Sequence, residues 1–314
     1  AARRDLGGEA GAQRHLSYNA GISACEKSKQ WQRALSLLGE MWKVRLEPVV
    51  NSYNAAISSC EKGLQWQRAL SLLSGMLEVR LEPTVISYSA GISACEKGLQ
   101  WQQALALLSG MWEMMMEPTV ISHNAAISAC GKGEQWQRAL ALLSELWTVK
   151  LEPHVTSYSA GISACEKGGL WQQALSLLSR MWEIALEPSV RSYSAGVSAC
   201  EKGGQWQQAL SLLREASEAN LELDVVLYSA GISACEKGEQ WQWALSLLSG
   251  MWEVRLEPTV IFSYSAGISA CEKGEQWLPA LALLCDLVQA KLDPDSATTL
   301  RSARARRVSS GSGL

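Results

Sequence analysis

The chain has 314 residues, of which 47% are hydrophobic, and its formal net charge is −3. This composition supplies enough apolar surface for a large core, and the small negative charge does not indicate a generally basic, nucleic-acid-binding protein. No run of letters approaches the roughly 18 apolar residues of a membrane-spanning helix, so the sequence predicts a soluble protein with no membrane partner.

The first 14 residues, AARRDLGGEAGAQR, carry charges of both signs and no apolar stripe. They have neither the apolar stretch of a signal peptide nor the acid-poor composition of a transit peptide. We expect residues 1–14 to be a disordered or truncated segment.

From residue 15 onward the sequence repeats itself about every 35 residues. The string YSAGISACEKGEQW begins at Tyr228 and again at Tyr264, and a Trp keeps the 35-residue spacing through seven copies, from Trp31 to Trp241. The eighth copy comes one residue late, because TVIFSYS replaces TVISYS. A period of this length indicates a protein of stacked repeats, here over residues 15–295.

Each repeat contains two helical patterns separated by a short polar turn and closed, in most copies, by the letters LEP. Tyr18, Ile22 and Cys25 form one apolar stripe, and Trp31 and Leu35 begin another. The sequence therefore predicts an all-α fold, a right-handed superhelical solenoid of about eight 35-residue helix-turn-helix repeats, with these five residues and their equivalents buried.

Further aromatic residues follow the same period. His123 takes the place of a Tyr in the first stripe and is interpreted as a core substitute. A second set of tryptophans stands near the end of the second helices and is also expected to pack; its members are Trp42, Trp112, Trp147, Trp182 and Trp252.

Eight of the nine cysteines fall once per repeat, and Cys285 lies outside the register. Equivalent positions of stacked helices lie about 10 Å apart, beyond the roughly 7 Å Cα separation that a disulfide allows. No CxxC pair occurs, and the three histidines do not cluster with cysteines, so no metal site is predicted. We expect reduced, structural thiols, as is typical of an intracellular protein.

Two polar rows lie beside the buried stripe of the first helices. One consists of Asn or Ser directly after the core Tyr, as at Asn19 and Ser89. The other is a Lys in every copy, nearly always preceded by Glu, as at Glu26 and Lys27. The lysines are interpreted either as contacts to a polyanion or as solvated charge pairs at a helix end.

The unit SHNAAISACGKGEQWQRALALLSELWTVKLEP, residues 122–153, resembles a pentatricopeptide repeat, and the resemblance extends over about 280 residues. It implies sequence-selective binding of single-stranded RNA, one base per repeat, in mitochondrial or plastid RNA processing, stability or translation. Helical-repeat readers of this kind use two or three side chains for each base.

The resemblance also implies which residues act. The residue after the Tyr (the reader residue) and the last residue of the unit (the cap residue) would read the base in pairs: Asn19 with Val49, Asn54 with Thr84, Ser89 with Thr119, Asn124 with His154, Ser159 with Ser189, Ser194 with Asp224, Ser229 with Thr259, and Ser265 with Asp295. Apolar residues two before the Tyr would sandwich the base: Leu16, Ile86, Ile121, Val226 and Phe262. The lysines would bind phosphates: Lys27, Lys62, Lys97, Lys132, Lys167, Lys202, Lys237 and Lys273.

In the family an Asn reader favours pyrimidines, a Ser reader favours purines, and Ser with a terminal Asp favours G. The pattern implied here is pyrimidine, pyrimidine, purine, pyrimidine, purine, G, purine, G. Three slots carry Asn51, Thr156 and Arg191 in place of an apolar residue, and only two of the eight cap residues are acidic. The implied selectivity is therefore weak to moderate.

Catalysis is not expected. A zinc deaminase extension would need HxE and CxxC motifs, and neither follows Asp295. Residues 296–314 read as a basic disordered tail. No cofactor, metal or small-molecule substrate is predicted, whereas protein effectors remain possible partners. The alternatives to RNA binding are a protein-binding helical scaffold and a recently amplified repeat array without a tuned target.

Overall fold

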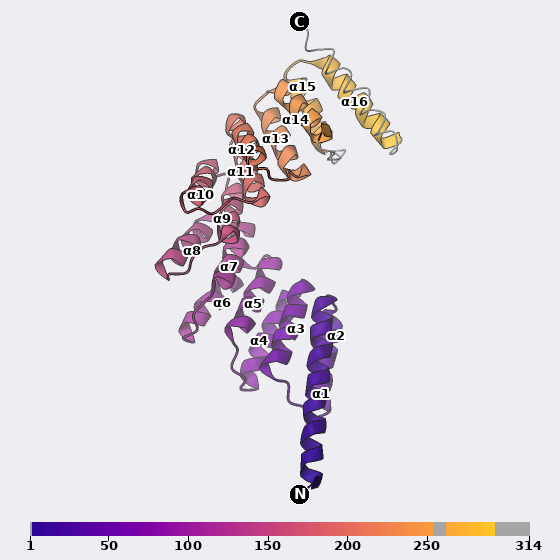
Figure 1. Cartoon of the computed structure of the whole chain (residues 1–314), viewed down its shortest axis with the longest axis vertical. Helices are drawn as coiled ribbons and strands as arrows, with labels where there is room; N and C mark the ends of the chain where they lie inside the picture. Colours follow the sequence, from indigo (N-terminus) through magenta and orange to yellow (C-terminus); the bar gives the residue numbers. More distant parts are fainter. Residues whose placement is uncertain (1, 254–261, 293–314) are drawn as a thin grey trace. The chain divides into compact units, whose positions relative to one another are not determined.

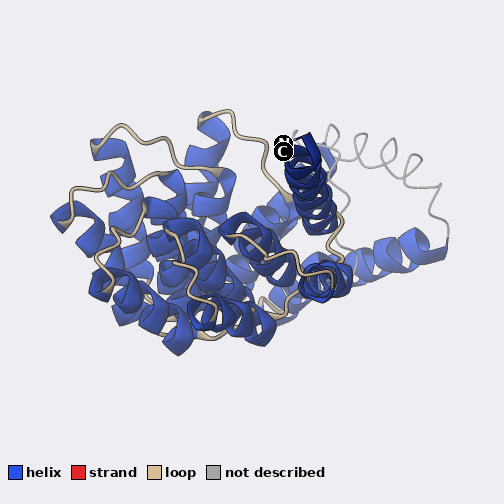
Figure 2. Cartoon of the chain, turned by 90° about the horizontal axis from the view of Figure 1, so that it is seen from below, coloured by secondary structure: helices blue, strands red, loops and turns tan. Residues whose placement is uncertain are grey.

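The computed structural model describes residues 2–253 and 262–292, with side chains described over residues 13–251 and 263–285. These residues form sixteen α-helices and no β-strand (Figure 2). The helices are α1 (Ala2–Lys27), α2 (Trp31–Lys43), α3 (Val50–Lys62), α4 (Trp66–Glu78), α5 (Val85–Lys97), α6 (Trp101–Glu113), α7 (Val120–Lys132), α8 (Trp136–Thr148), α9 (Val155–Lys167), α10 (Trp171–Glu183), α11 (Val190–Lys202), α12 (Trp206–Glu218), α13 (Val225–Lys237), α14 (Trp241–Glu253), α15 (Phe262–Lys273) and α16 (Trp277–Leu292).

Every repeat contributes a first helix, with an odd number, and a second helix, with an even number. Side-chain caps fix where several first helices begin. Thr84 Oγ1 accepts a hydrogen bond from the backbone N–H of Ser87 at 3.4 Å, and Asp224 Oδ1 accepts one from Leu227 at 2.8 Å. Such caps satisfy N–H groups that have no partner inside the helix. Five cap residues of the predicted pairs are thus the N-caps of their helices: Val49, Thr84, Thr119, Ser189 and Asp224.

Short turns join the helices. After each first helix the chain passes through one residue with positive φ, as at Leu64 with φ of 59° and Gly169 with φ of 67°. The second helix closes with a backbone bond such as Leu46 N–H to the carbonyl of Met41 at 2.9 Å. The Pro that follows, Pro48, cannot continue a helix, so the chain turns into the next repeat.

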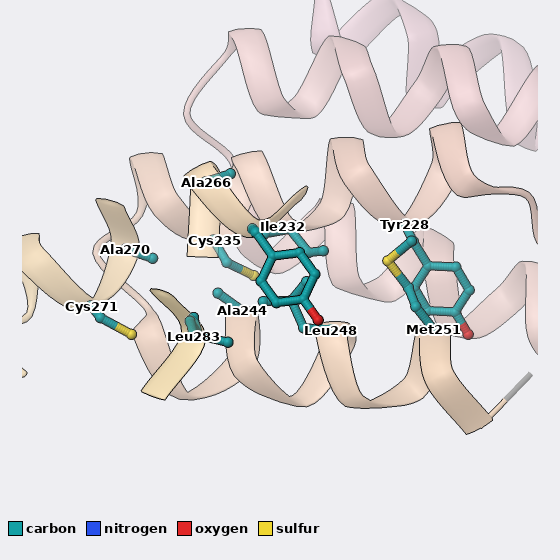
Figure 3. Packing of buried hydrophobic residues seen from close by; sticks show 11 residues of the cluster. Tyr228, Ile232, Cys235, Ala244, Leu248, Met251, Ala266, Ala270, Cys271 and Leu283 are labelled. Atoms are coloured by element: carbon teal, nitrogen blue, oxygen red, sulfur yellow. The ribbon is translucent and has the colours of Figure 1, made fainter. Parts of the chain in front are cut away.

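The core forms where a first helix faces its own second helix and the next first helix. In the last repeats, Tyr228, Ile232 and Cys235 of α13 pack against Leu248 and Met251 of α14 (Figure 3). The same positions are buried in each preceding repeat from α3 onward, and His123 is buried in the Tyr slot as predicted. Burial of these stripes stabilises each repeat by removing apolar surface from water.

Three of the positions expected in the core are only half-buried. Tyr18 lies in a terminal repeat, which has a neighbouring repeat on one side only. Trp31 and Leu35 flank the buried edge of α2, which is formed by Ala34, Leu38 and Met41. In the second helices through α14, the residues equivalent to Trp31 and Leu35 are also half-buried. The side of each second helix that faces the neighbouring helices is instead the one that carries the equivalent of Ala34.

The tryptophans near the ends of the second helices are more exposed than predicted. Their exposed fractions lie between 41% and 49% at Trp42, Trp112, Trp147 and Trp182. They follow the last buried residue of each second helix, where the helix leaves the core, so one face of each indole meets solvent. The side chain of Trp252 lies outside the described residues.

The chain divides into two compact units, Ala1–Ala164 and Cys165–Leu314. In the first, α1, α3, α5 and α7 stack in order, and α2, α4 and α6 each pack against their own first helix and the next one (Figure 1). In the second, α11, α13 and α15 stack in the same way, with α12 and α14 packed against consecutive first helices.

The predicted class, an all-α solenoid of helix-turn-helix repeats, is confirmed. At the N-terminus, α1 begins at Ala2, so residues 2–14 of the segment expected to be disordered or truncated are helical. That segment contains four Ala and three Arg, which favour helices, and no Pro, although it also contains three Gly. The predicted tail, residues 296–314, lies outside the described residues.

Candidate nucleic-acid interface

The described apolar residues predicted to sandwich bases are exposed, and three of them, Ile86, Ile121 and Val226, stand second in their helices. Their exposed fractions are 69% at Leu16, 66% at Ile86, 68% at Ile121 and 62% at Val226. Neighbours in the same slot, such as Asn51 and Arg191, are exposed as well. The structure thus leaves one side chain per repeat uncovered in this slot, apolar in about half of the copies. The side chain of Phe262 lies outside the described residues.

In the first two pairs, the reader and cap residues lie together. Asn54 Nδ2 lies 3.5 Å from Thr84 Oγ1, and Ser87 joins the two residues by donating to Asn54 Oδ1 at 2.6 Å. Asn19 and Val49 are joined in the same way, because Ser52 donates to Asn19 Oδ1 at 2.5 Å and accepts from the Val49 N–H at 3.2 Å.

The next two pairs differ from one another. Ser122 Oγ lies 2.8 Å from Ser89 Oγ and 3.1 Å from Thr119 Oγ1, so it links that pair. Asn124 instead donates through Nδ2 to Thr156 Oγ1 at 3.1 Å. Its Oδ1 is buried without a hydrogen-bond partner.

The later pairs are seen in part. Ser159 donates to the carbonyl of Val155 at 2.8 Å, and Ser189 caps α11 by accepting from the N–H of Ser192 at 3.3 Å. Ser229 donates to the Val225 carbonyl at 2.7 Å. Thr259 and Asp295, the predicted partners of Ser229 and of the exposed Ser265, lie outside the described residues.

The Ser194 and Asp224 pair lacks the intervening serine. Leu227 occupies that position, and the Ser194 hydroxyl is buried without a hydrogen-bond partner. Asp224 caps α13 through Oδ1 and is exposed. Among the described pairs that lie within one unit, this is the one that combines a Ser with an acidic cap residue.

The lysine row is paired with the glutamate row of the preceding repeat. Lys62 Nζ lies 2.8 Å from Glu26, and Lys97 Nζ lies 2.8 Å from Glu61. The same pairing joins Lys132 to Glu96, Lys202 to Glu166, Lys237 to Glu201 and Lys273 to Glu236, at 2.9–3.1 Å. The interpretation of the lysines as half of a charge pair is therefore correct for these contacts, although the pairs bridge repeats.

One step of this ladder differs because Gly131 replaces the glutamate. Lys167 contacts Glu166 of its own helix at 3.4 Å, and Glu166 also binds Lys202. A carboxylate shared between two ammonium groups leaves an excess of positive charge at this point of the row. The ladder is otherwise neutral, in agreement with the low net charge of the chain.

Sequence reasoning missed the buried serines that precede the core Tyr. They are Ser52, Ser87, Ser122, Ser157, Ser192 and Ser263, here called linker serines, and all are fully buried. The repeated dipeptide Ser-Tyr, or Ser-His at residue 122, is the signal that could have found them. A serine near a helix start is usually interpreted as part of an N-cap, so its contact with the preceding repeat is easily overlooked.

Other kinds of site are not found in the described part of the chain. Within it, no group of three or more His, Cys, Asp or Glu side chains is placed to hold a metal ion. None of the described helices combines the length and the apolar character that a bilayer span requires. Burial raises the pKa of the thiols of Cys60, Cys95 and Cys130 to about 11, so these groups are not activated nucleophiles.

Comparison with known proteins identifies the family of the chain and supports its fold. The pentatricopeptide repeat domain model matches residues 15–62 and 211–273, and the PPR repeat model matches 51–81, 121–148 and 156–184. Together the matches cover more than half of the chain. No curated protein matches it.

Among solved structures, the chain is similar to the pentatricopeptide repeat protein PPR10 from maize, with 20% identity and a TM-score of 0.77 over 95% of this chain and 43% of that one. A structure of PPR10 with an 18-nt psaJ RNA element matches with 18% identity and a TM-score of 0.52, over 91% of this chain and 52% of that one. The chain therefore spans about half the length of PPR10, and the likeness shows the fold.

Proposed function

Because the chain belongs to the pentatricopeptide repeat family, we propose that it binds single-stranded RNA along its first helices, with one base at each repeat. The observation that carries the proposal is the order of side chains on each first helix. An exposed residue two positions before the core Tyr or His, a polar reader directly after it, and a lysine recur in the repeats whose side chains are described. A similar fold has been solved with RNA in PPR10.

Each of the three rows of side chains would supply a different part of the binding. Exposed apolar side chains such as Ile86 and Ile121 offer van der Waals contact to the face of a base without regard to its identity. The reader and cap residues offer hydrogen bonds to the base edge, and this is where selectivity arises. The lysines contribute sequence-independent attraction to phosphates.

The glutamate ladder does not prevent phosphate binding. The lysine side chains in the ladder are between about one third and one half exposed. An exposed ion pair of this kind is worth about 0–1 kcal/mol. A phosphate can therefore take the place of a glutamate at small cost, but the net gain per lysine is also small. We expect modest affinity with a measurable salt dependence.

The base pattern of the family carries over as part of the proposal. Ser194 with Asp224 would select G, and so would Ser265 with Asp295. The unpartnered Ser194 hydroxyl supports the first assignment, because a buried polar group without a hydrogen bond gains free energy when a base supplies one. The other repeats would select more weakly, since their cap residues are neutral or, at His154, aromatic.

Selection from a random single-stranded RNA pool tests this function. Wild-type protein should enrich a motif with a G at the position of the sixth repeat, and Ser194→Asn should move that position toward U while affinity stays nearly unchanged. Excess double-stranded RNA should compete poorly, because its bases are not accessible to the readers. Failure of the wild-type protein to enrich any sequence or to retain the pool at low salt would refute the proposal.

A protein-binding scaffold is the second candidate, and two observations favour it. The Glu–Lys ladder neutralises the first helices, and exposed tryptophans mark the second helices at Trp42, Trp112 and Trp147. Aromatic side chains are common in protein interfaces. If Trp112→Ser abolished recovery of a partner from cell extract while RNA binding remained absent, this function would replace RNA binding.

The cellular setting belongs to the proposal as well. A mitochondrial or plastid location, and a role in RNA processing, stability or translation, follow from the family alone. No catalytic step is assigned to this chain, and a protein effector would supply any chemistry on the bound RNA. Fractionation of cells that express the tagged protein tests the location.

A further inference from the structure

The linker serines occupy a position between two repeats. All six are fully buried, and five of them stand third in their first helices, whereas Ser263 stands second in α15. Ser52, Ser87 and Ser122 contact both the cap residue of their own helix and the reader residue of the preceding repeat. A buried hydroxyl must find hydrogen-bond partners, and it has one proton to donate. The partners of that hydroxyl therefore determine what it can fix.

The acceptor side of the linker serine is used within its own helix. Ser52 accepts from the Val49 N–H at 3.2 Å, Ser87 from the Thr84 N–H at 3.0 Å, and Ser157 from the His154 N–H at 3.1 Å. The proton then remains for a partner outside the helix. At Ser52 and Ser87 that partner is the side-chain carbonyl of an asparagine, Asn19 or Asn54.

We infer that each linker serine is a positioning residue, which holds the reader residue of the preceding repeat in one orientation and so sets the base edge which that repeat accepts. The inference rests on the proposed function. With Oδ1 of Asn54 bound by Ser87 at 2.6 Å, the amide nitrogen, which lies 3.5 Å from Thr84 Oγ1, is the polar group left to meet a base. Such a reader donates hydrogen bonds and favours a base with a carbonyl oxygen, as in uracil, over adenine.

The chain contains its own exceptions. At the sixth repeat Leu227 replaces the serine, and the Ser194 hydroxyl has no partner. At the fourth repeat the amide nitrogen of Asn124 donates to Thr156 Oγ1 at 3.1 Å, and Asn124 Oδ1 has no hydrogen-bond partner. Ser157 is the linker serine that corresponds to this reader residue. In other repeats an isoleucine occupies the slot of Thr156, as at Ile86 and Ile121. Ser194 is therefore not held by a hydrogen bond of its hydroxyl, and Asn124 is held through its amide nitrogen, whereas Asn19 and Asn54 are held through their carbonyl oxygens.

The test measures base preference at the second repeat. Its position in the RNA is located by selection with wild-type protein, and the affinities for RNAs that carry U or A there are then compared. Wild-type protein should prefer U by about fivefold or more, within the range of a specific base contact. Ser87→Ala should bring the ratio close to one and change the affinity for the A-containing RNA little. Ser87→Thr, which keeps the hydroxyl, should restore the ratio.

Two further variants reverse the exceptions. Leu227→Ser should sharpen base preference at the sixth repeat, and Thr156→Ile should do so at the fourth, by freeing Asn124 to meet Ser157. Melting temperatures of all variants separate loss of folding from loss of selectivity. An unchanged U-to-A ratio in folded Ser87→Ala overturns the inference but leaves RNA binding standing. Absence of RNA binding in the wild type overturns the proposed function instead.

Discussion

The indole of Trp66 lies directly against Gly98 of the next repeat. A β-carbon added at position 98 would stand 2.3 Å from Trp66 Cδ1, and the same contact recurs between Trp31 and Gly63. The half-buried tryptophan at the start of a second helix thus packs on the glycine that follows the next first helix in six described repeats, those of Trp31, Trp66, Trp101, Trp171, Trp206 and Trp241. This contact explains the glycine in the repeated Lys-Gly dipeptide without any functional role.

Replacement of that glycine should destabilise the fold. Gly98→Ala forces the Trp66 indole to move, and we expect a loss of about 1–3 kcal/mol in the free energy of unfolding. Gly75→Ala is the matched control, because a β-carbon there meets nothing within 4 Å and the residue lies inside α4. It should stabilise by about 1 kcal/mol through helix propensity. Urea denaturation that gave both variants the same sign would contradict the packing.

Glycine should be favourable at the turn between the two helices of a repeat. Leu64 and Leu99 both have φ of 59°, and the chain itself uses glycine at Gly169 and Gly204. A residue with a side chain loses about 1–2 kcal/mol of stability when its backbone adopts the left-handed conformation with positive φ. Leu99→Gly should therefore raise the melting temperature, whereas Leu99→Ala, which keeps most of the strain, should not. A lower melting temperature for the glycine variant would refute this account of the turn.

The repeat cysteines should be unreactive. Burial raises the pKa of Cys165 and Cys200 to about 11 and that of Cys235 to about 12. Native protein at pH 8 should react with a thiol reagent mainly at the exposed Cys285, and Cys285→Ser should remove that fast phase. Rapid labelling of the repeat cysteines, or disulfides among them in non-reducing mass spectrometry, would contradict this prediction.

The same pKa values give a direction for stability at high pH. Unfolded thiols ionise near pH 9, whereas the buried ones keep their protons to about pH 11. Between these values the unfolded state binds fewer protons, so the free energy of unfolding should fall as pH rises. Denaturation curves at pH 8 and pH 10 check the sign, and Cys95→Ala should reduce the slope.

The charge ladder should oppose RNA binding. Glu96→Gln removes the carboxylate that binds Lys132 at 3.0 Å, so we expect tighter RNA binding and a steeper salt dependence. Glu82→Gln is the matched control, since Glu82 is exposed on a connection between repeats. Equal effects of Glu96→Gln and Glu82→Gln would argue against a local role of the ladder.

Removal of the lysines should have the opposite effect on the salt dependence. Changing Lys97, Lys132, Lys167 and Lys202 together to Ala should weaken binding to every RNA. The slope of log affinity against log salt concentration should flatten by about 0.7 for each phosphate that is no longer neutralised. A gel-shift series over salt concentration measures this slope, and an unchanged slope would show that the lysines do not bind phosphates.

The fold was predictable because the period and the apolar stripes are strong signals in the sequence. Tyr53, Ile57 and Cys60 are buried as their spacing requires. The partial exposure of Trp31 was not predictable, because helical spacing locates a stripe but not the side of it that the next repeat covers. The helix over residues 2–14 was missed because it has no stripe at all.

The candidate site was predictable only where the family supplied positions. The exposure of Ile86 and the proximity of Asn54 to Thr84 agree with those positions. The role of Ser87 and the pairing of Lys97 with Glu61 depend on contacts between residues 33 and 36 positions apart. Such contacts follow from how one repeat stacks on the next, which a single repeat does not reveal.

The most direct test of the central claim is a fluorescence-anisotropy titration of labelled single-stranded RNA at low salt. It compares wild-type protein, the double variant Ile86→Glu and Ile121→Glu, and the control Gln67→Glu on the exposed face of α4. Because both isoleucines are exposed, the double variant should fold normally. We expect saturable binding by the wild type and the control, and at least about tenfold weaker binding by the double variant, which adds two negative charges beside the RNA. No binding by the wild type, or equal binding by all three proteins, would contradict RNA recognition by the first helices.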